Sequence, residues 1–300
     1  VGEMRRSTTA VGVGLSAVLQ AALAALVAAQ ATQAPAPAPA AAGFPGQYAP
    51  PPAERKFPAW PKGCARFEGE EKMSCLDTVA SDFGGFYRYA AANEALAAPK
   101  PGEDRVVFFG DSITDNWSKP EYGGFFPGRP YVNRGIGGQT TAQMLLRFRA
   151  DVLELSPRAV VILAGTNDIA GNAGPVTPAQ IQDNLASMAE LARLHGVHVV
   201  LASLLPVSDD KRDANGQPVT RTRQRPTATL RELNAWLSRY ATQNGHVYLD
   251  YFSATADGSG LLRPELNDDG LHPNAKGYAV MAPLAEKAIA ESLRKAAPKR

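Results

Sequence analysis

The sequence predicts an α/β domain in which helices cover both faces of a five-stranded parallel sheet, a three-layer α/β/α sandwich. Five short apolar runs alternate with stretches whose apolar residues recur at helical spacing. Continuous apolar runs are typical of parallel strands that are buried on both sides. Glycine and small polar residues follow several of these runs, as expected where parallel strands end at a ligand site.

The apolar runs define the predicted strands. Val106 to Phe109 is the first, and the run from Ala159 is the most apolar, so we expect it at the centre of the sheet. Sequential strands joined by helices require right-handed crossovers, which place the loops after each strand at one edge. The predicted strands are 106–109, 131–136, 159–164, 197–205 and 246–252.

Apolar residues at intervals of three or four predict the helices between the strands. In the clearest case Ile181, Leu185 and Met188 share one face. Aromatic residues and leucine at similar spacing predict an earlier helix that packs on the domain and ends before Pro99. The predicted helices are about 83–96, 144–155, 178–195, 229–243 and 274–293.

The N-terminal region has the pattern of an export signal behind a short upstream extension. Met4-Arg5-Arg6 precedes an uncharged apolar run, and Ala29-Gln30-Ala31 fits a small-x-small cleavage site. A permanent membrane anchor is the alternative, because the run approaches the length of a span. The predicted segments are a signal (1–31), a Pro/Ala-rich linker (32–53), a partly helical N-terminal extension (54–103) and a catalytic domain (104–300).

A cleaved signal implies a periplasmic or extracellular protein without a stable membrane span. In that oxidising environment we expect a disulfide between Cys64 and Cys75, the only cysteines, with two unpaired thiols as the alternative. The net charge of +2 gives no electrostatic footprint for a nucleic-acid partner. No motif indicates a metal or an organic cofactor.

Residues suited to nucleophilic catalysis follow the predicted strands. A serine hydroxyl needs an adjacent base, and Ser112 follows the first strand while His272 follows the fifth. The Asp-x-x-His spacing lets Asp269 orient the imidazole and stabilise its charged form. Asp268 is the rival for this role, and a plain helix N-cap is the structural alternative for Ser112.

The negative charge of a tetrahedral intermediate requires hydrogen-bond donors. We expect them from the backbone N–H groups of Ser112 and Gly138 and from the side-chain amide of Asn167. A tight turn at Gly138 and a helix cap at Asn167 are the structural alternatives. The neighbouring Asp111 and Asp168 are expected to hold loop backbone.

These residues resemble the sequence blocks of the SGNH hydrolases, also called the GDSL esterase/lipase family. The resemblance runs in the right order through most of the predicted domain and implies a flavodoxin-like fold and the roles given above. Trp117 after the first block looks most like the platelet-activating-factor-acetylhydrolase-like branch and similar bacterial esterases, and it is a candidate substrate-binding residue. The matching blocks are Gly110-Asp111-Ser112-Ile113-Thr114, with Ile where the family name has Leu, Gly138 within 133–140, Gly165-Thr166-Asn167-Asp168 and Asp269-x-x-His272.

A polar insertion, Ser208–Pro226, follows the fourth strand on the catalytic side. It contains Arg221, Arg223 and Arg225, which are candidates for binding an acidic or polyhydroxylated substrate from a rim or lid. A solvated loop is the alternative.

We therefore expect an exported serine esterase that hydrolyses small-acyl esters, mainly acetyl esters, of a small molecule, lipid or polysaccharide. The short acyl group is implied by the family resemblance. A lysophospholipase or thioesterase with the same triad is the nearest alternative. A cell-envelope glycan O-acyltransferase would differ only in the acceptor of the acyl group, and a glycan-binding protein without activity is disfavoured by the retained catalytic positions.

Overall fold

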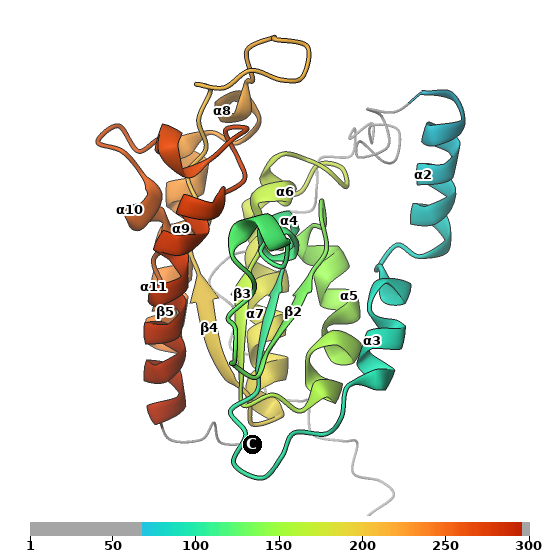
Figure 1. The fold of residues 1–300 in the computed structure, drawn as a ribbon, viewed down its shortest axis with the longest axis vertical. Helices are drawn as coiled ribbons and strands as arrows, with labels where there is room; N and C mark the ends of the chain where they lie inside the picture. Colours follow the sequence, from blue (N-terminus) through green and yellow to red (C-terminus); the bar gives the residue numbers. More distant parts are fainter. Residues whose placement is uncertain (1–67, 296–300) are drawn as a thin grey trace, which may run out of the picture. The chain divides into compact units, whose positions relative to one another are not determined.

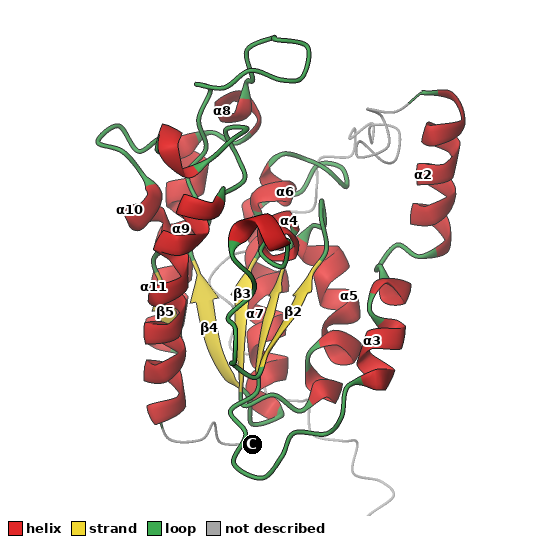
Figure 2. Ribbon diagram, in the orientation of Figure 1, coloured by secondary structure: helices red, strands yellow, loops and turns green. Residues whose placement is uncertain are grey.

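A computed structural model of the protein describes residues 68–295. Its centre is one five-stranded sheet with the strand order β2-β1-β3-β4-β5 (Figures 1 and 2). Every neighbouring pair of strands is parallel, and β3 is central, as predicted. The strands are β1 (Val106–Gly110), β2 (Tyr131–Gly135), β3 (Ala159–Leu163), β4 (His198–Ala202) and β5 (Val247–Leu249).

Helices cover both faces of the sheet, which confirms the three-layer architecture. On one face α7 packs between α5 and α9, and on the other α11 lies against β3, β4 and β5. Their bounds are α5 (Thr141–Asp151), α7 (Pro178–Leu194), α9 (Thr227–Gln243) and α11 (Ala275–Arg294). The shorter elements are α2 (Gly69–Ser81), α3 (Ala90–Ala95), α4 (Ser112–Asn116), α6 (Thr166–Ile169), α8 (Arg221–Gln224) and α10 (Tyr251–Thr255), with 3₁₀ helices η2 (Phe86–Arg88), η3 (Pro120–Tyr122), η4 (Leu153–Leu155) and η5 (Pro264–Leu266).

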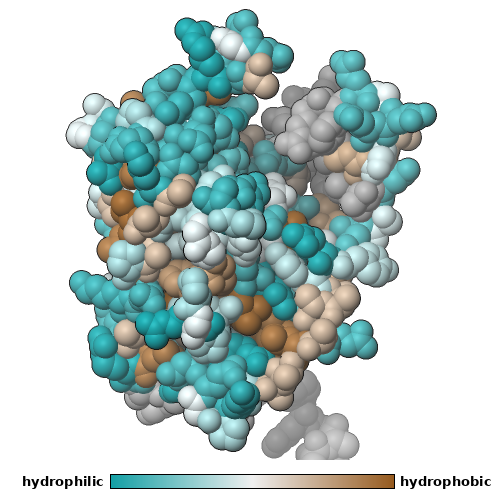
Figure 3. Space-filling model, in the orientation of Figure 1, coloured by the Kyte–Doolittle hydropathy of each residue, from teal (hydrophilic) through white to brown (hydrophobic). Residues whose placement is uncertain are grey.

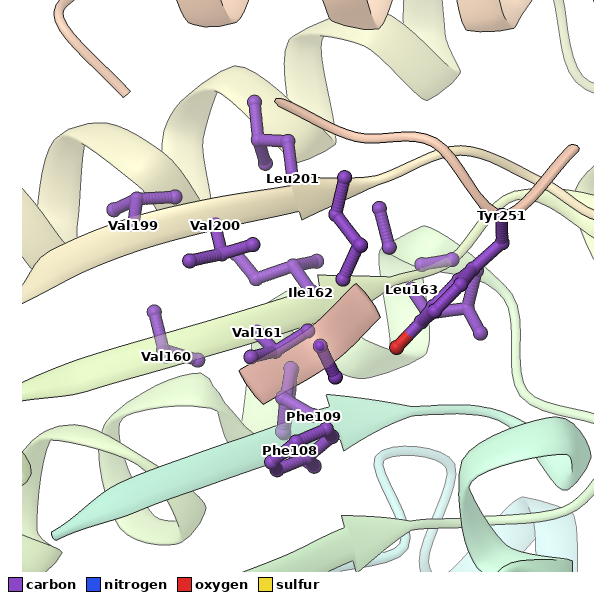
Figure 4. Packing of buried hydrophobic residues seen from close by; sticks show 14 of the residues in the cluster. Phe108, Phe109, Val160, Val161, Ile162, Leu163, Val199, Val200, Leu201 and Tyr251 are labelled. Carbon is purple, nitrogen blue, oxygen red and sulfur yellow. The ribbon is translucent and has the colours of Figure 1, made fainter. Parts of the chain in front are cut away.

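The hydrophobic core lies between the sheet and these helices (Figure 4). Side chains of the three inner strands, such as Phe109, Val160 and Leu201, are completely buried. Burial of one such side chain contributes about 1.5–3 kcal/mol to folding. The strand ends are therefore firmly held, and so are the loops that begin there.

Several predicted elements were wrong in their bounds. The fourth strand, expected over 197–205, ends at Ala202. The fifth strand stops at Leu249, because the Asp250 side chain accepts a hydrogen bond from the Ser253 N–H and begins α10 instead. The helix expected over 83–96 is divided into η2 and α3, because Tyr89 between them has a non-helical φ of −119°. The helix α2 was not predicted.

Several predictions concern residues outside 68–295. The signal, the linker and Cys64 belong to that part of the chain. Cys75 is disulfide-bonded, and its pairing with Cys64 stays a prediction. None of the helices between residues 68 and 295 combines the length and hydropathy that a membrane span requires.

Candidate active site

The catalytic candidates lie where the strands of the parallel sheet end. The helix α4 begins with Ser112 directly after β1, and α6 carries Asn167 directly after β3; both helices lie beyond the arrowhead ends of the strands (Figure 1). The Asp111 carboxylate caps α4 by accepting from the Ile113 N–H at 3.0 Å. Carboxyl ends of parallel strands share one edge, so both helices project their first residues into the same space.

The structure brings Ser112, His272 and Asp269 together in one hydrogen-bonded chain. Ser112 Oγ lies 2.9 Å from His272 Nε2, and His272 Nδ1 lies 2.8 Å from Asp269 Oδ2. The other oxygen of Asp269 accepts from the His272 backbone N–H at 2.8 Å. Asp268 instead accepts from the Asn274 side chain. Asp269 is therefore the carboxylate that contacts the imidazole.

The surroundings of Asp269 favour its ionised form. Burial by itself raises the pKa of this carboxyl, but the hydrogen bond and charge of His272 and the backbone N–H groups of His272 and Leu271 outweigh burial and hold the pKa well below its usual value. An ionised Asp269 accepts from Nδ1–H, which leaves the Nε2 lone pair free to accept the proton of Ser112.

The expected oxyanion donors lie around Ser112. A Cβ built on Gly137 would be 3.7 Å from the Ser112 Cβ, so the β2–α5 loop that contains Gly138 passes beside the nucleophile. Gly138 has a φ of +82°, a conformation that favours glycine. The Asn167 amide nitrogen contacts Gln139 O at 3.0 Å and Asp111 Oδ2 at 3.4 Å. This contact with residues adjoining Gly138 and Ser112 places the amide at the same site.

The expectation that Trp117 binds substrate is wrong. Its side chain is 3% exposed, and its ring packs 4.9 Å from the Tyr278 ring and 5.9 Å from the Phe108 ring. The indole therefore lies between α4 and α11, among the rings of Phe108 and Tyr278. Trp117 therefore belongs to the core beneath the nucleophile.

Of the three loop arginines, only Arg223 is exposed. Arg225 is 4% exposed, and Arg221 donates to the Asp269 carboxylate at 3.2 Å. Arg225 is buried and Arg221 is only partly exposed, and both guanidinium groups are already hydrogen-bonded within the protein. Arg223 alone remains a candidate for contact with an anionic substrate.

A fourth arginine, Arg147, was overlooked in the sequence, and it holds the ends of the two strands that lead into the catalytic loops. It is fully buried, and its guanidinium donates to Gly110 O at 3.1 Å and to Arg134 O at 2.9 Å. Gly110 is the last residue of β1 and Arg134 is the last but one of β2, so both carbonyls lie just before the catalytic loops. Arg147 also donates to Gln139 Oε1 and pairs with Asp151 at 2.9 Å. The sequence signal was available: Arg147 and Asp151 are four residues apart on the apolar face of a helix.

The buried carboxyl of Asp111 predicts a pH-dependent stability. Desolvation raises the pKa of Asp111 to about 6. Between pH 4 and 6 the unfolded chain has lost this proton while the folded protein retains it, so the wild type loses stability as pH rises through this window. We expect Asp111→Asn to gain about 1 to 3 kcal/mol over the wild type between pH 4.5 and 7.5, with the gain complete above about pH 6.

Urea unfolding at several pH values measures this difference. Asp183→Asn, the same change at an exposed position of α7, is the control and should show no such trend. A stability difference between Asp111→Asn and the wild type that is constant from pH 4.5 to 7.5 would contradict the raised pKa of Asp111.

The fold and the site together define the class of protein, an ester hydrolase with a polar site at the carboxyl edge of a parallel sheet. Residues 108–280 match the GDSL-like lipase/acylhydrolase family. The chain belongs to this family, and it is a carboxylic ester hydrolase of the GDSL/SGNH type.

The chain resembles known members of the family to different extents. It is 40% identical to the structure of a GDSL-like lipase from Bacteroides thetaiotaomicron, with a TM-score of 0.63 over 70% of this chain and 98% of that one. It is 34% identical over 125 residues to the Bacillus subtilis lipoprotein YqeF, covering 35% of this chain and 50% of YqeF. It is 47% identical over 73 residues to the Pseudomonas aeruginosa esterase TesA, covering 24% of this chain and 35% of TesA.

A more distant match extends over more of the chain. The human platelet-activating factor acetylhydrolase IB subunit alpha2 is 24% identical over 225 residues, which cover 73% of this chain and 91% of that subunit. The predicted resemblance to the acetylhydrolase branch is thus present as a distant homology. The bacterial relatives YqeF and TesA are matched over half of their length or less.

Proposed function

We propose that the enzyme hydrolyses short-acyl esters, acetyl esters above all, through an acyl-enzyme on Ser112. The observation that carries the proposal is the chain of hydrogen bonds from Ser112 Oγ through His272 to Asp269. His272 Nε2 takes the hydroxyl proton while Oγ forms a bond to the ester carbonyl carbon. The same imidazolium then gives that proton to the leaving alkoxide as the ester bond breaks.

A water molecule completes the cycle by the same chemistry in reverse. His272 takes a proton from the water, the resulting hydroxide attacks the acyl carbon, and the acid leaves as Ser112 regains its proton. In both halves the negative oxygen of the tetrahedral intermediate accepts from the N–H groups of Ser112 and Gly138 and from the Asn167 amide. Losing one such donor costs about 3–4 kcal/mol of transition-state stabilisation.

The preference for a short acyl group is supported by the acetylhydrolase named among the relatives. The glycines beside the nucleophile, Gly137 and Gly138, are exposed, which leaves room for a bulky alcohol such as a polysaccharide, lipid or aryl group. Export to the periplasm or the extracellular space is supported by the signal-like residues 1–31 and by a lipoprotein relative.

A chain-length series of p-nitrophenyl esters tests the acyl preference. We expect kcat/KM to be highest for the acetate and at least about tenfold lower for the octanoate. Acetylated xylan and pectin assayed beside the series test a polysaccharide substrate. Higher kcat/KM for long-chain esters or for thioesters would favour the lysophospholipase or thioesterase alternative, and acetylated glycan products formed from an acetyl donor would favour acyl transfer.

A further inference from the structure

The insertion 208–226 is held against the catalytic loops by hydrogen bonds at both of its ends. Ser208 N donates to Gly270 O at 2.9 Å, and Lys211 Nζ donates to Pro264 O at 2.9 Å. Near the other end Arg221 donates to Asp269 O, and Thr222 N donates to Asp209, which joins the two ends of the insertion to each other. Figure 3 shows a largely hydrophilic surface over the α8 region that this segment forms. The segment therefore joins the site as a structured element with a polar outer side.

Arg221 of this segment contacts the carboxylate that orients the imidazole. Its Nε donates to Asp269 O at 3.1 Å, and its Nη2 donates to Asp269 Oδ2 at 3.2 Å. The same Oδ2 receives His272 Nδ1. Arg221 thus fixes Asp269 through both its backbone and its side chain.

Gly270 allows the two segments to approach closely. It has a φ of +81°, and a Cβ at this position would lie 2.3 Å from Ser208 O and 3.2 Å from Arg221 Cγ. Any side chain there would push the insertion away from the loop that holds Asp269 and His272. The glycine at position 270 is therefore what allows the insertion 208–226 to lie against the loop that holds Asp269 and His272.

Arg225 contacts the opposite side of the site, at the Asn167 amide. Its Nη2 lies 3.4 Å from Asn167 Oδ1, and its Nε donates to Thr166 Oγ1 at 3.0 Å. Asn172 Nδ2 donates to the same Oδ1 at 2.9 Å. Because two donors face the amide oxygen, the amide nitrogen must point the other way, toward Gln139 O and Asp111 Oδ2.

We infer that Arg221 and Arg225 are positioning residues, through which one segment holds both the triad carboxylate and the oxyanion-hole amide. The inference rests on the proposed function, since it assumes that Asp269 and Asn167 act in catalysis. A guanidinium on the amide oxygen also polarises the carboxamide, which strengthens the hydrogen bond that its N–H donates. If these two arginines bound substrate instead, their removal would raise KM for an anionic ester and leave kcat for an uncharged ester unchanged.

The kinetic test compares Arg225→Met with Arg212→Met, which changes an exposed arginine of the same insertion and serves as the matched control. With uncharged p-nitrophenyl acetate we expect Arg225→Met to lower kcat by about 10- to 100-fold, less than the loss of the donor itself. KM should stay within about twofold of the wild-type value. Arg212→Met should leave both constants unchanged.

A double-mutant cycle separates positioning from general damage. In an Asn167→Ala background, Arg225→Met should lower kcat by less than about threefold, because the group that it positions is already gone. An equal loss in both backgrounds would overturn the inference, as would an unchanged kcat. A rise in KM confined to the anionic ester p-nitrophenyl succinate would show substrate binding instead.

Arg221→Met provides a second test at a partly exposed position, should Arg225→Met fail to fold. Without the two hydrogen bonds from Arg221, Asp269 holds the imidazole of His272 less firmly. With p-nitrophenyl acetate we expect kcat to fall by about 5- to 20-fold while KM stays within about twofold. In an Asp269→Ala background the same change should lower kcat by less than about threefold, and an equal loss in both backgrounds would contradict the role of Arg221. Full activity in Ser112→Ala would instead refute the proposed function, independently of either arginine.

Discussion

Replacing Ser112 by alanine is expected to lower kcat for p-nitrophenyl acetate by about 10⁴- to 10⁶-fold. Without Oγ, His272 Nε2 has no hydroxyl to deprotonate and no acyl-enzyme can form. The oxyanion donors and the bound substrate geometry remain, so the residual rate should still exceed that of water. Release of p-nitrophenol under steady-state conditions measures the loss.

The unfolding midpoint should change little in Ser112→Ala, since the side chain is only half-buried and α4 is capped by Asp111. Ser253→Ala, at an exposed position of α10, is the matched control and should keep full activity. A Ser112→Ala protein with wild-type kcat would remove the proposed mechanism, whatever the fate of the family assignment.

The second large effect is on stability. Replacing Arg147 by methionine is expected to lower the free energy of unfolding by about 3–5 kcal/mol, because Asp151 is left as an unpaired buried charge and the carbonyls of Gly110 and Arg134 lose a donor. Methionine keeps most of the side-chain volume, so the loss reports on charge and hydrogen bonding more than on a cavity. Urea denaturation with linear extrapolation measures it.

Arg149→Met is the matched control, because this arginine lies on the exposed side of the same helix. It should change stability by less than about 0.5 kcal/mol. Adding Asp151→Leu to Arg147→Met removes the unpaired carboxylate and should recover part of the loss. A single Arg147→Met variant within 1 kcal/mol of the wild type would contradict this account.

The strands and the meeting of the serine with the histidine could be predicted from sequence, since both follow from local patterns. Apolar runs mark the strands, and the order of the motifs places them after strand ends at one edge. The boundary at Asp250 was also readable, as an acidic residue three positions before Ser253 is a typical helix start. It was missed because the following Tyr251 and Phe252 continue the apolar run.

The arginines of the insertion 208–226 and Trp117 could not be placed in this way. A charged residue in a polar insertion is usually solvated, and Arg225 is buried only because the insertion 208–226 packs on α6, where Arg225 contacts Thr166 and Asn167. Trp117 follows the nucleophile closely in sequence, but the turn at the end of α4 directs it into the core. Segments that are distant in sequence decide which side chains of a short loop are buried, and local sequence patterns carry no information about such segments.

The contacts of residues 83–95 determine how far the chain can be shortened for expression. The Gly84 carbonyl accepts from the side chain of Gln139, next to Gly138, and the Tyr89 hydroxyl donates to Gly135 O at the end of β2. A fragment that starts at Asp104, the beginning of the predicted catalytic domain, would leave both groups without these partners. A minimal active fragment should therefore start before Phe83, so that the strand beside the nucleophile keeps its outer support.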